Sequence, residues 1–388
     1  MVLSYFRPLP KSYLVHDFQF KISILTNYHP LGNLNIENFD RGALLLWPDM
    51  TSEIPVEFQI EEEHEILDIT TNKWIQQLMN HCTGYKNGFI RVNPSGYVFN
   101  AETRKYLQRL RKFEVRNDDI WICTFPKCGT TWTQEMVWCL MNNLNFEMSK
   151  TVELDVRTVF IEHVSILDDT SSWYSADTIQ KVADMPSPRI IKTHLPFDLL
   201  PDQIRTREKT PKLIHVFRNS RDVCVSHYHH WKILKGFNGS FDLWSELFLE
   251  GYGGYYSPYW KHVKSYYTSQ YRNILYLQYE DMKKDMKKTI EATCSFLGTE
   301  NYTEDDKALL EQHLSFKNFQ QTPTLNKQRE VKLLDKMGWS NQDDGGAFVR
   351  KGIVGDWMNY FSNDKSEKFQ QKDAELSNST GLVIKSQI

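Results

Sequence analysis

Asp119-Ile-Trp-Ile-Cys-Thr-Phe-Pro-Lys-Cys-Gly-Thr-Thr-Trp132 is the stretch of sequence that decides the fold. It reads as a buried strand that runs into a tight loop with one lysine, one glycine and two hydroxyl residues. The amphipathic pattern of residues 133–144 predicts that a helix follows. A loop of this kind directs backbone N–H groups, an ammonium and hydroxyls at an anion beside the positive end of a helix. The stretch therefore predicts a phosphate-binding loop.

This loop differs from the nucleotide loop of ATP-binding proteins. The Walker A pattern is G-x-x-x-x-G-K-[ST], in which the lysine follows the second glycine. Here Lys127 precedes Gly129, the only glycine of the loop. The order disfavours an ATP-type loop, although a kinase of the P-loop class remains an alternative that ATP turnover would support.

Three further short apolar runs continue the order of strand and helix. We expect strands at residues 189–193, 212–217 and 273–278, helices at residues 222–234, 241–250 and 281–297, and a hairpin around residues 84–99. Alternating strands and helices predict an α/β fold with a central parallel sheet flanked by helices. Ligands of such sheets bind beyond the carboxyl ends of the strands, so the candidate site residues are sought there.

The chain is predicted to hold one main domain. Residues 1–55 are punctuated by Asn and Pro and have little periodicity, which indicates an N-terminal extension, weakly structured or packed on the core, whose role is open. Residues 56–388 are expected to form the catalytic domain. Within it, residues 320–347 are rich in Gln, Asn, Asp and Gly and resemble a mobile loop.

Charge and cysteine content exclude several classes of partner and compartment. The formal net charge of −3, from 46 basic and 49 acidic side chains, gives no long-range attraction for nucleic acid or an anionic membrane. Six cysteines form no C-x-x-C pair, and no apolar run of about 20 residues occurs. We therefore expect a cytoplasmic protein that has reduced thiols, no metal site and no nucleic-acid or membrane partner.

Two polar side chains lie at the end of the strand expected at residues 189–193. Lys192 and His194 are two residues apart, so both point to one side of an extended chain. A lysine beside a histidine suits the removal of a hydroxyl proton while negative charge builds on a transferring anion. The alternative is an ordinary strand end with solvent-facing polar residues.

Two further segments carry groups of the phosphate-binding type. Arg218 ends a strand and Ser226 lies two helical turns later, so both can address one phosphate. Asp222 between them fits a structural role, as a helix cap or a partner of Arg221. The basic run Arg350-Lys351-Gly352 is either a second phosphate clamp or a solvated turn. Two such clusters imply a ligand with two separated phosphates.

Aromatic residues near these segments are candidates for a purine site. Trp132, Tyr279 and Phe316 are able to sandwich a flat base, although core packing alone also accounts for them. No catalytic triad and no G-x-G-x-x-G pattern occurs, so hydrolysis and hydride transfer are poorly supported.

These segments together resemble the cytosolic sulfotransferase family, and the region of residues 70–150 is similar to insect members. The likeness covers about residues 60–370 and rests on five motifs in the order that the family uses: residues 124–132, 192–196, 218–226, 279–281 and 350–357. The resemblance implies a P-loop-like α/β fold. It also implies transfer of a sulfuryl group from 3′-phosphoadenosine 5′-phosphosulfate (PAPS) to a small hydroxyl or amine acceptor.

The resemblance also implies roles for single residues. His194 would be the general base, and Lys127, Lys192 and Ser226 would complete the catalytic set. The co-substrate would be bound by three groups of residues: Lys127, Cys128, Gly129, Thr130 and Thr131 at the 5′-phosphate and sulfate; Arg218, Ser226, Arg350, Lys351 and Gly352 at the 3′-phosphate; Trp132, Tyr279, Ser315 and Phe316 around the adenine.

The chain departs from the family pattern at three places. Cys128 stands where Ser is usual and Leu314 where Thr is usual, so we expect donor binding to be weaker by about 1 kcal/mol for each lost hydrogen bond. The family's dimer segment after Gly-Asp-Trp keeps only Glu367, while Met358 and Ser362-Asn363 replace its other residues. The homodimer of the family is therefore doubtful here.

Two alternatives share the predicted fold. Some insect relatives sulfate an allylic alcohol such as retinol transiently and release a dehydrated product. A non-catalytic carrier is disfavoured, because Lys127, Lys192, His194 and Ser226 are all present. The acceptor, whether phenol, steroid or terpenoid alcohol, is not determined by the sequence.

Overall fold

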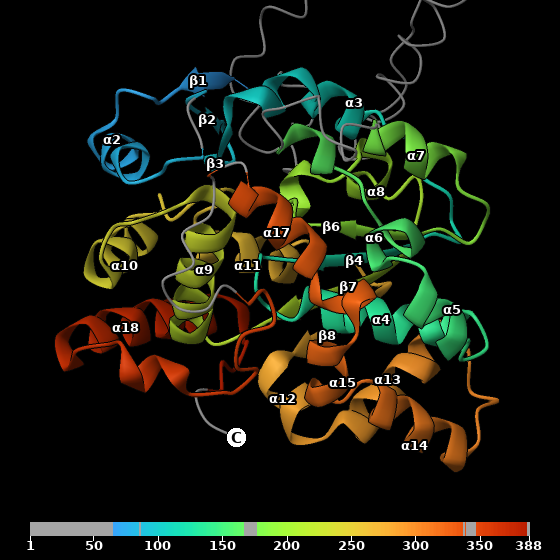
Figure 1. The fold of residues 1–388 in the computed structure, drawn as a ribbon. Helices are drawn as coiled ribbons and strands as arrows, with labels where there is room; N and C mark the ends of the chain where they lie inside the picture. Colours follow the sequence, from blue (N-terminus) through green and yellow to red (C-terminus); the bar gives the residue numbers. More distant parts are fainter. Residues whose placement is uncertain (1–64, 85–86, 167–176, 337, 339–346, 386–388) are drawn as a thin grey trace, which may run out of the picture. The chain divides into compact units, whose positions relative to one another are not determined.

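The computed structural model describes residues 65–84, 87–166, 177–336, 338 and 347–385 (Figure 1). These residues belong to a compact unit bounded by Ile60 and Ile388. The predicted boundary between an extension and a catalytic domain lies outside the described residues and stays a prediction.

A five-stranded parallel sheet forms the centre of this unit, in the order β5-β6-β4-β7-β8. Its strands are β4 (Ile120–Thr124), β5 (Val159–Phe160), β6 (Ile190–Thr193), β7 (Lys212–Phe217) and β8 (Ile274–Gln278). A separate antiparallel sheet joins β1 (Ile66–Asp68), β2 (Phe89–Val92) and β3 (Tyr97–Asn100). The predicted α/β class and the predicted hairpin are confirmed, whereas β5 was missed.

The sheet is covered on both faces, and its central strand is buried at every position. On β4, Ile120 and Ile122 pack into one core cluster with α4, and Trp121 and Cys123 pack into the other. Alternate residues of a strand point to opposite faces, so this strand needs helices on both sides. The parallel sheet is therefore buried, as the sequence predicts.

The helices before β7 are short, apart from α2 and α4. They are α2 (Lys73–Asn80), α3 (Leu107–Arg111), α4 (Thr130–Met141), α5 (Phe146–Thr151), α6 (Leu154–Arg157), α7 (Thr178–Asp184) and α8 (Asp202–Arg205), with the 3-10 helices η5 (Ala101–Lys105), η6 (His163–Ser165) and η7 (Phe197–Leu199).

After β7 the chain is mostly helical. The helices are α9 (Ser220–Lys235), α10 (Phe241–Leu249), α11 (Tyr259–Thr268), α12 (Tyr279–Lys284), α13 (Met286–Leu297), α14 (Glu304–His313), α15 (Phe316–Gln321), α16 (Pro323–Asn326), α17 (Gln328–Lys336), η8 (Asp356–Asn359) and α18 (Asn363–Thr380). No helix of the described ranges is long and apolar enough to cross a membrane.

Two helical predictions need correction. The helix expected at residues 281–297 is two helices, because Asp285 leaves helical backbone geometry and caps α13 through the N–H of Lys288. Residues 320–347 were expected to be a mobile loop, but α15, α16 and α17 occupy residues up to Lys336. Val331 and Leu334 bury one face of α17, which lies beside α9 (Figure 1). Residues 337 and 339–346 lie outside the described part.

Candidate active site

The predicted anion loop lies where the order of the sheet reverses. β4 is flanked by β6 on one side and β7 on the other, so the loop after β4 opens between the residues that follow β6 and β7. Ligands of open α/β sheets bind at such a switch point. The topology therefore brings the four predicted segments to one edge of the sheet.

The loop backbone requires glycine at its turn into α4. Gly129 has φ +106°, and a Cβ there would lie 2.9 Å from the ring of Tyr279. Lys127 also has a positive φ, +70°. Thr130 begins the 12-residue helix α4, and its Oγ1 lies 2.6 Å from Oγ1 of Thr124. The N-terminus of α4, which has unpaired N–H groups and the positive end of the helix dipole, thus lies close to Lys127 in the sequence.

A cavity of about 320 Å³ lies at this edge of the sheet. Fourteen of the sixteen residues predicted for the site line it: Lys127, Gly129, Thr130, Thr131, Trp132, Lys192, His194, Arg218, Ser226, Tyr279, Phe316, Arg350, Lys351 and Gly352. Segments that are far apart in the sequence therefore meet in one cavity.

Cys128 and Ser315 do not line this cavity. The Cys128 side chain is fully buried, with Sγ 4.0 Å from the carbonyl of Pro126, and the Ser315 hydroxyl caps α15. A hydroxyl at position 128 would therefore point away from the cavity in this structure. The predicted weakening of donor binding by the side chain of Cys128 loses its structural reason.

His194 directly follows β6 and is held in one tautomer. Its Nδ1 lies 2.7 Å from the carbonyl oxygen of Thr124, which only accepts hydrogen bonds, so Nδ1 carries the proton and Nε2 is the basic nitrogen. Burial, together with the charge of Lys192, holds the pKa of His194 well below its usual range. The imidazole is thus uncharged and able to accept a proton.

Two lysines of the cavity have lowered pKa values. Burial, reinforced by the charges of Arg218 and Lys192, lowers the pKa of Lys127 to about 7. Burial, reinforced by Lys327, lowers the pKa of Lys192 to about 8. Both ammonium groups lie against aromatic faces, at 4.0 Å from the ring centre of Phe348 and 4.1 Å from that of Phe160. An anion between them would stabilise their charged forms.

Arg218 joins the anion loop to the segment that contains Arg350. Its guanidinium donates to the carbonyls of Lys127 at 3.4 Å and Ile353 at 2.9 Å, and it lies 4.1 Å from the ring centre of Tyr279. A phosphate bound at this arginine would therefore contact both segments.

The basic segment is fixed by two aspartates. Asp356 accepts from Arg350 and, at 2.8 Å, from Lys351. Asp222 accepts from the backbone N–H groups of Gly355 at 2.8 Å and Trp357 at 3.2 Å. Asp222 has a structural role, as predicted, but Asn219 and not Asp222 caps α9. Besides these backbone groups, Asp222 forms an ion pair with Arg218 at 3.9 Å. The aspartates thus hold the cations of the clamp in place.

Aromatic rings form one wall of the cavity. Trp132 and Tyr279 lie with ring centres 5.9 Å apart, and Nε1 of Trp132 donates to the carbonyl of Leu314 at 2.7 Å. Phe316 packs against Gly352 so closely that a Cβ on this glycine would lie 2.3 Å from the ring. The wall offers flat apolar faces next to the cationic clamp, which suits a purine nucleotide.

Comparison with known proteins identifies the family. The model of the sulfotransferase domain matches residues 117–378. The chain belongs to the sulfotransferase family. It is 34% identical over 322 residues to luciferin sulfotransferase of the insect Photinus pyralis. The aligned region covers 81% of this chain and 84% of the relative. It is 32% identical to sulfotransferase 1E1 of Homo sapiens, over 80% of this chain and 100% of the relative. The predicted family and enzyme class are confirmed, and the protein is a PAPS-dependent sulfotransferase.

Solved structures of the family support the same fold and co-substrate. Retinol dehydratase in complex with androsterone and the inactive cofactor PAP has a TM-score of 0.73 and 25% identity, over 83% of this chain and 98% of the relative. A second structure of retinol dehydratase, with retinol and PAP, matches equally well, with a TM-score of 0.73.

The sequence did not predict several residues that line the cavity of this sulfotransferase. Phe160, His230, Tyr256, Lys327 and Phe348 are among them. They come from β5, α9, the turn before α11, the junction between α16 and α17, and the segment that begins at residue 347. Phe160 ends a strand of only two residues, and Tyr256 has a positive φ in a loop, so neither lies in a pattern that sequence periodicity detects.

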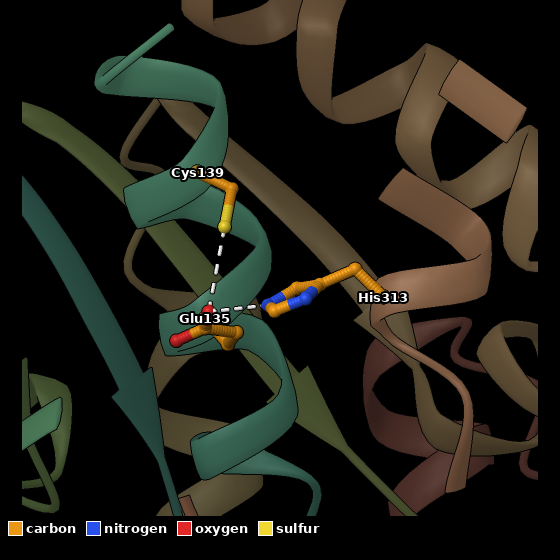
Figure 2. Close-up of side chains that lie close together, drawn as sticks. All are labelled: Glu135, Cys139 and His313. Atoms are coloured by element: carbon orange, nitrogen blue, oxygen red, sulfur yellow. Dashed lines mark hydrogen bonds and ion pairs between the residues drawn. The ribbon is translucent and has the colours of Figure 1, made fainter. Parts of the chain in front are cut away.

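A cluster of possible metal ligands lies apart from the cavity. Glu135 and Cys139 on α4 meet His313 at the end of α14 (Figure 2). Oε1 of Glu135 accepts from His313 at 2.8 Å and from Ser149 at 2.5 Å, and Oε2 accepts from Arg157 at 2.7 Å. A guanidinium on the carboxylate opposes a second cation, so these contacts describe a buried ion pair that ties α4 to α5, α6 and α14.

We predict that Glu135→Gln lowers the free energy of unfolding by about 3–5 kcal/mol, because the buried Arg157 loses its charged partner. Burial alone raises the pKa of Glu135, but His313, Arg157 and Ser149 together lower it to about 2, so the carboxylate is ionised at neutral pH. Urea unfolding measures the change. Glu147→Gln is the control, because its pair with Lys150 is exposed and is worth less than about 1 kcal/mol. Equal effects of the two variants would contradict the prediction.

Proposed function

We propose that the enzyme transfers the sulfuryl group of PAPS to the hydroxyl of a small, partly hydrophobic acceptor such as a phenol, a steroid or a terpenoid alcohol, with His194 as the general base. The observation that carries this proposal is the position of His194. His194 lines a cavity together with two lysines, the predicted anion loop and an aromatic wall, and its Nδ1 is held by the carbonyl of Thr124.

The residues present fit a nucleotide with two separated phosphates. Lys127, Gly129, Thr130 and Thr131 would bind the 5′-phosphate and the sulfate, because they surround the N-terminus of α4. Arg218, Ser226, Arg350, Lys351 and Gly352 would bind the 3′-phosphate, and Trp132, Tyr279 and Phe316 would frame the adenine. Cys128 would contribute its backbone N–H alone, and Ser315 would support Phe316 as the cap of α15.

The residues of the chain would act by position and charge. PAPS, when bound, supplies an activated sulfuryl group and a phosphate leaving group. His194 would take the proton of the acceptor hydroxyl at Nε2, while Lys127 and Lys192 would stabilise the charge that develops on the transferring and leaving oxygens. In-line transfer between two oxygens needs no covalent nucleophile on the protein.

The other walls of the cavity support an apolar acceptor. The rings of Phe160 and Tyr256 lie 5.0 and 5.5 Å from that of His194. Further aliphatic and aromatic residues line the same cavity: Val156, Val159, Ile166, Trp231, Leu234, Tyr255 and Leu334. Such walls stabilise a flat or hydrophobic molecule, and the base and the lysines select its hydroxyl. The names of two relatives, luciferin sulfotransferase and retinol dehydratase, include small molecules of this kind.

A second candidate function is elimination through a transient sulfate, as in the alternative that the sequence left open. The likeness to retinol dehydratase, with a TM-score of 0.73, favours it for an allylic alcohol. Mass spectrometry of the products of PAPS with phenolic, steroidal and isoprenoid alcohols separates the two. We expect stable sulfate esters, whereas free sulfate with a dehydrated acceptor would replace the proposal by the dehydratase.

We predict that binding of 3′-phosphoadenosine 5′-phosphate (PAP) weakens as the pH rises. The lowered pKa of Lys127, about 7, means that the unliganded protein loses this charge above pH 7, and Lys192 follows above about pH 8. An anion requires both ammonium groups, so binding takes up protons, and the affinity should fall roughly tenfold per pH unit for each lysine. Calorimetry between about pH 6 and pH 9 measures this.

Lys127→Arg is the control for this pH effect. A guanidinium stays charged throughout the range, so the decrease that begins near pH 7 should disappear. An affinity of the wild-type protein for PAP that does not change with pH would contradict the prediction.

Other predictions from the sequence remain proposals. They are a cytoplasmic location, the absence of nucleic-acid and membrane partners, the absence of a metal, and the doubtful family homodimer. Met358 of the altered dimer segment is exposed on η8, which leaves this surface accessible in the described unit.

A further inference from the structure

Glu162 is a buried carboxylate at the edge of the sheet that carries the site. It is the second residue after β5, whereas His194 is the first after β6, and its side chain is 1% exposed. Oε1 accepts from the backbone N–H of His194 at 2.5 Å. The base is therefore held twice, through its backbone by Glu162 and through Nδ1 by the carbonyl of Thr124.

Glu162 also interacts with Tyr256. Within the described residues, neither Oε2 of Glu162 nor the hydroxyl of Tyr256 has a hydrogen-bond partner, although both are buried. The two groups interact, because after burial itself the charge of Glu162 is the main cause that raises the pKa of the Tyr256 phenol. The ring of Tyr256 lies 5.5 Å from that of His194, edge to face, and lines the cavity. The carboxylate thus lies between the base and a residue of the cavity wall.

Burying a carboxylate is costly, and a backbone N–H alone does not require one. A neutral amide oxygen would accept the same hydrogen bond from His194. Only a carboxylate supplies negative charge, and negative charge near His194 opposes the charge of Lys192, which disfavours protonation of the imidazole. An imidazolium that forms during proton transfer would be stabilised by this nearby charge, although the carboxylate contacts the backbone of His194 and not its ring.

We propose that Glu162 is the positioning residue of the catalytic base, which fixes the backbone of His194 and stabilises the imidazolium through its charge. The inference rests on the proposed role of His194. The proton of the acceptor moves to Nε2 of His194 and stays there, and Glu162 neither gains nor loses a proton in the step.

The ionisation of Glu162 gives this role a pH signature. Burial, against the hydrogen bond from His194 and the charge of Lys192, raises the pKa of Glu162 to about 7. The charge is therefore present above pH 7 and is lost as the pH falls through 7. His194 stays neutral near pH 7 because its own pKa is lowered. The lysines titrate in the opposite sense, because Lys127 and Lys192 lose their charges as the pH rises. The titratable groups that face Glu162 are Cys123, Lys192, His194, Tyr256 and Tyr266.

The chain offers a matched control in Glu280. This carboxylate is also 1% exposed, accepts from a backbone N–H directly after a strand region, that of Asn219 at 2.9 Å, and leaves Oε2 unpaired within the described residues. Burial raises its pKa to about 7 as well. It lies near Arg218, away from the base, so Glu280→Gln should change the KM for PAPS and keep the pH dependence of kcat.

The test is the pH profile of kcat for wild type, Glu162→Gln, Glu280→Gln and His194→Gln, with PAPS and an acceptor that the wild type sulfates. Glu162→Gln keeps an oxygen for His194 but removes the charge. We expect kcat above pH 7 to fall by about 10- to 100-fold, and the decrease of the wild-type kcat below pH 7 to disappear. Calorimetry with PAP verifies that the variant is folded.

Tyr256→Phe provides a second measurement if Glu162→Gln does not fold. Removal of the hydroxyl beside the carboxylate should move the acid limb of kcat to higher pH. A wild-type kcat and an unchanged acid limb in Glu162→Gln, or loss of the limb in Glu280→Gln as well, would overturn the inference but leave the proposed function intact. Failure of the wild type to sulfate any acceptor, or full activity of His194→Gln, would instead overturn the proposed function and the inference with it.

Discussion

His194→Gln is expected to lower kcat for sulfuryl transfer by about 10²–10⁴-fold, the usual contribution of a general base. The reason is local. Nδ1 of His194 is committed to the carbonyl of Thr124, so Nε2 is the nitrogen that takes up the acceptor proton, and a glutamine has no basic nitrogen there. Steady-state rates with PAPS and an identified acceptor measure the effect. Affinity for PAP should stay close to that of the wild type, because the phosphates are assigned to other residues.

His230→Gln is the matched control for this substitution. His230 lines the same cavity, and burial lowers its pKa well below the usual range, as it does for His194. Its ring packs against Phe348 at 5.5 Å, however, and it has no assigned role in proton transfer. We therefore expect a much smaller loss of kcat. Equal losses for the two variants would contradict the assignment of the base.

Lys127→Gln is the second large prediction, with an expected decrease of kcat/KM by about 10²–10³-fold. Lys127 lies in the loop before the N-terminus of α4, and its backbone carbonyl accepts a hydrogen bond from Arg218. The reacting oxygens of the donor are proposed to lie there. The charge of Lys127 would stabilise the transition state most strongly, because negative charge develops there. Both kcat and the affinity for PAP should therefore fall. Single-turnover rates at saturating PAPS separate the chemical step from binding.

Lys351→Gln serves as the comparison for charge alone. It removes the same unit of charge from the cavity, but Lys351 belongs to the clamp that would bind the 3′-phosphate, a group that does not react. We expect a weaker KM for PAPS with a kcat nearer to that of the wild type. If both lysine variants changed only KM, Lys127 would be a binding residue without a part in the chemical step.

The local sequence predicted those parts of the fold that have a period or a turn signal. The strand Lys212–Phe217 has the predicted bounds, because a mostly apolar run lies between Pro211 and Arg218. The helix α4 begins at Thr130, three residues before its predicted start, because its N-cap is Gly129 and no side-chain cap marks the position. When the cap is formed by left-handed backbone geometry, a glycine is the only sign of it in the sequence.

Tertiary context decided the parts that the sequence missed. Residues 328–336 look polar enough for a loop, yet Val331 and Leu334 at helical spacing bury one face of α17 against the rest of the unit. A pattern in which only two of nine residues become buried predicts a helix weakly, until the surface against which the helix packs is known. The same holds for Glu162, whose importance appears only when β5 places it against the backbone of His194.

The candidate site was more predictable than its surroundings, for a physical reason. Anion-binding side chains stand directly after strands, and the parallel sheet brings those positions together whatever the intervening chain does. The acceptor side of the cavity is built from loops and helix faces, such as those of Phe160 and Tyr256, whose placement depends on long-range packing. The residues proposed for donor recognition are therefore predictable from local sequence, and those proposed for acceptor recognition are not.

The measurement that tests the central claim most directly is transfer of ³⁵S from labelled PAPS to a panel of phenolic, steroidal and isoprenoid alcohols, with wild type and His194→Ala in parallel. The account predicts a labelled sulfate ester from at least one acceptor with the wild type, its loss in the variant, and retained PAP binding by both. No binding of PAP at millimolar concentration, or an ester formed equally well without His194, would contradict it.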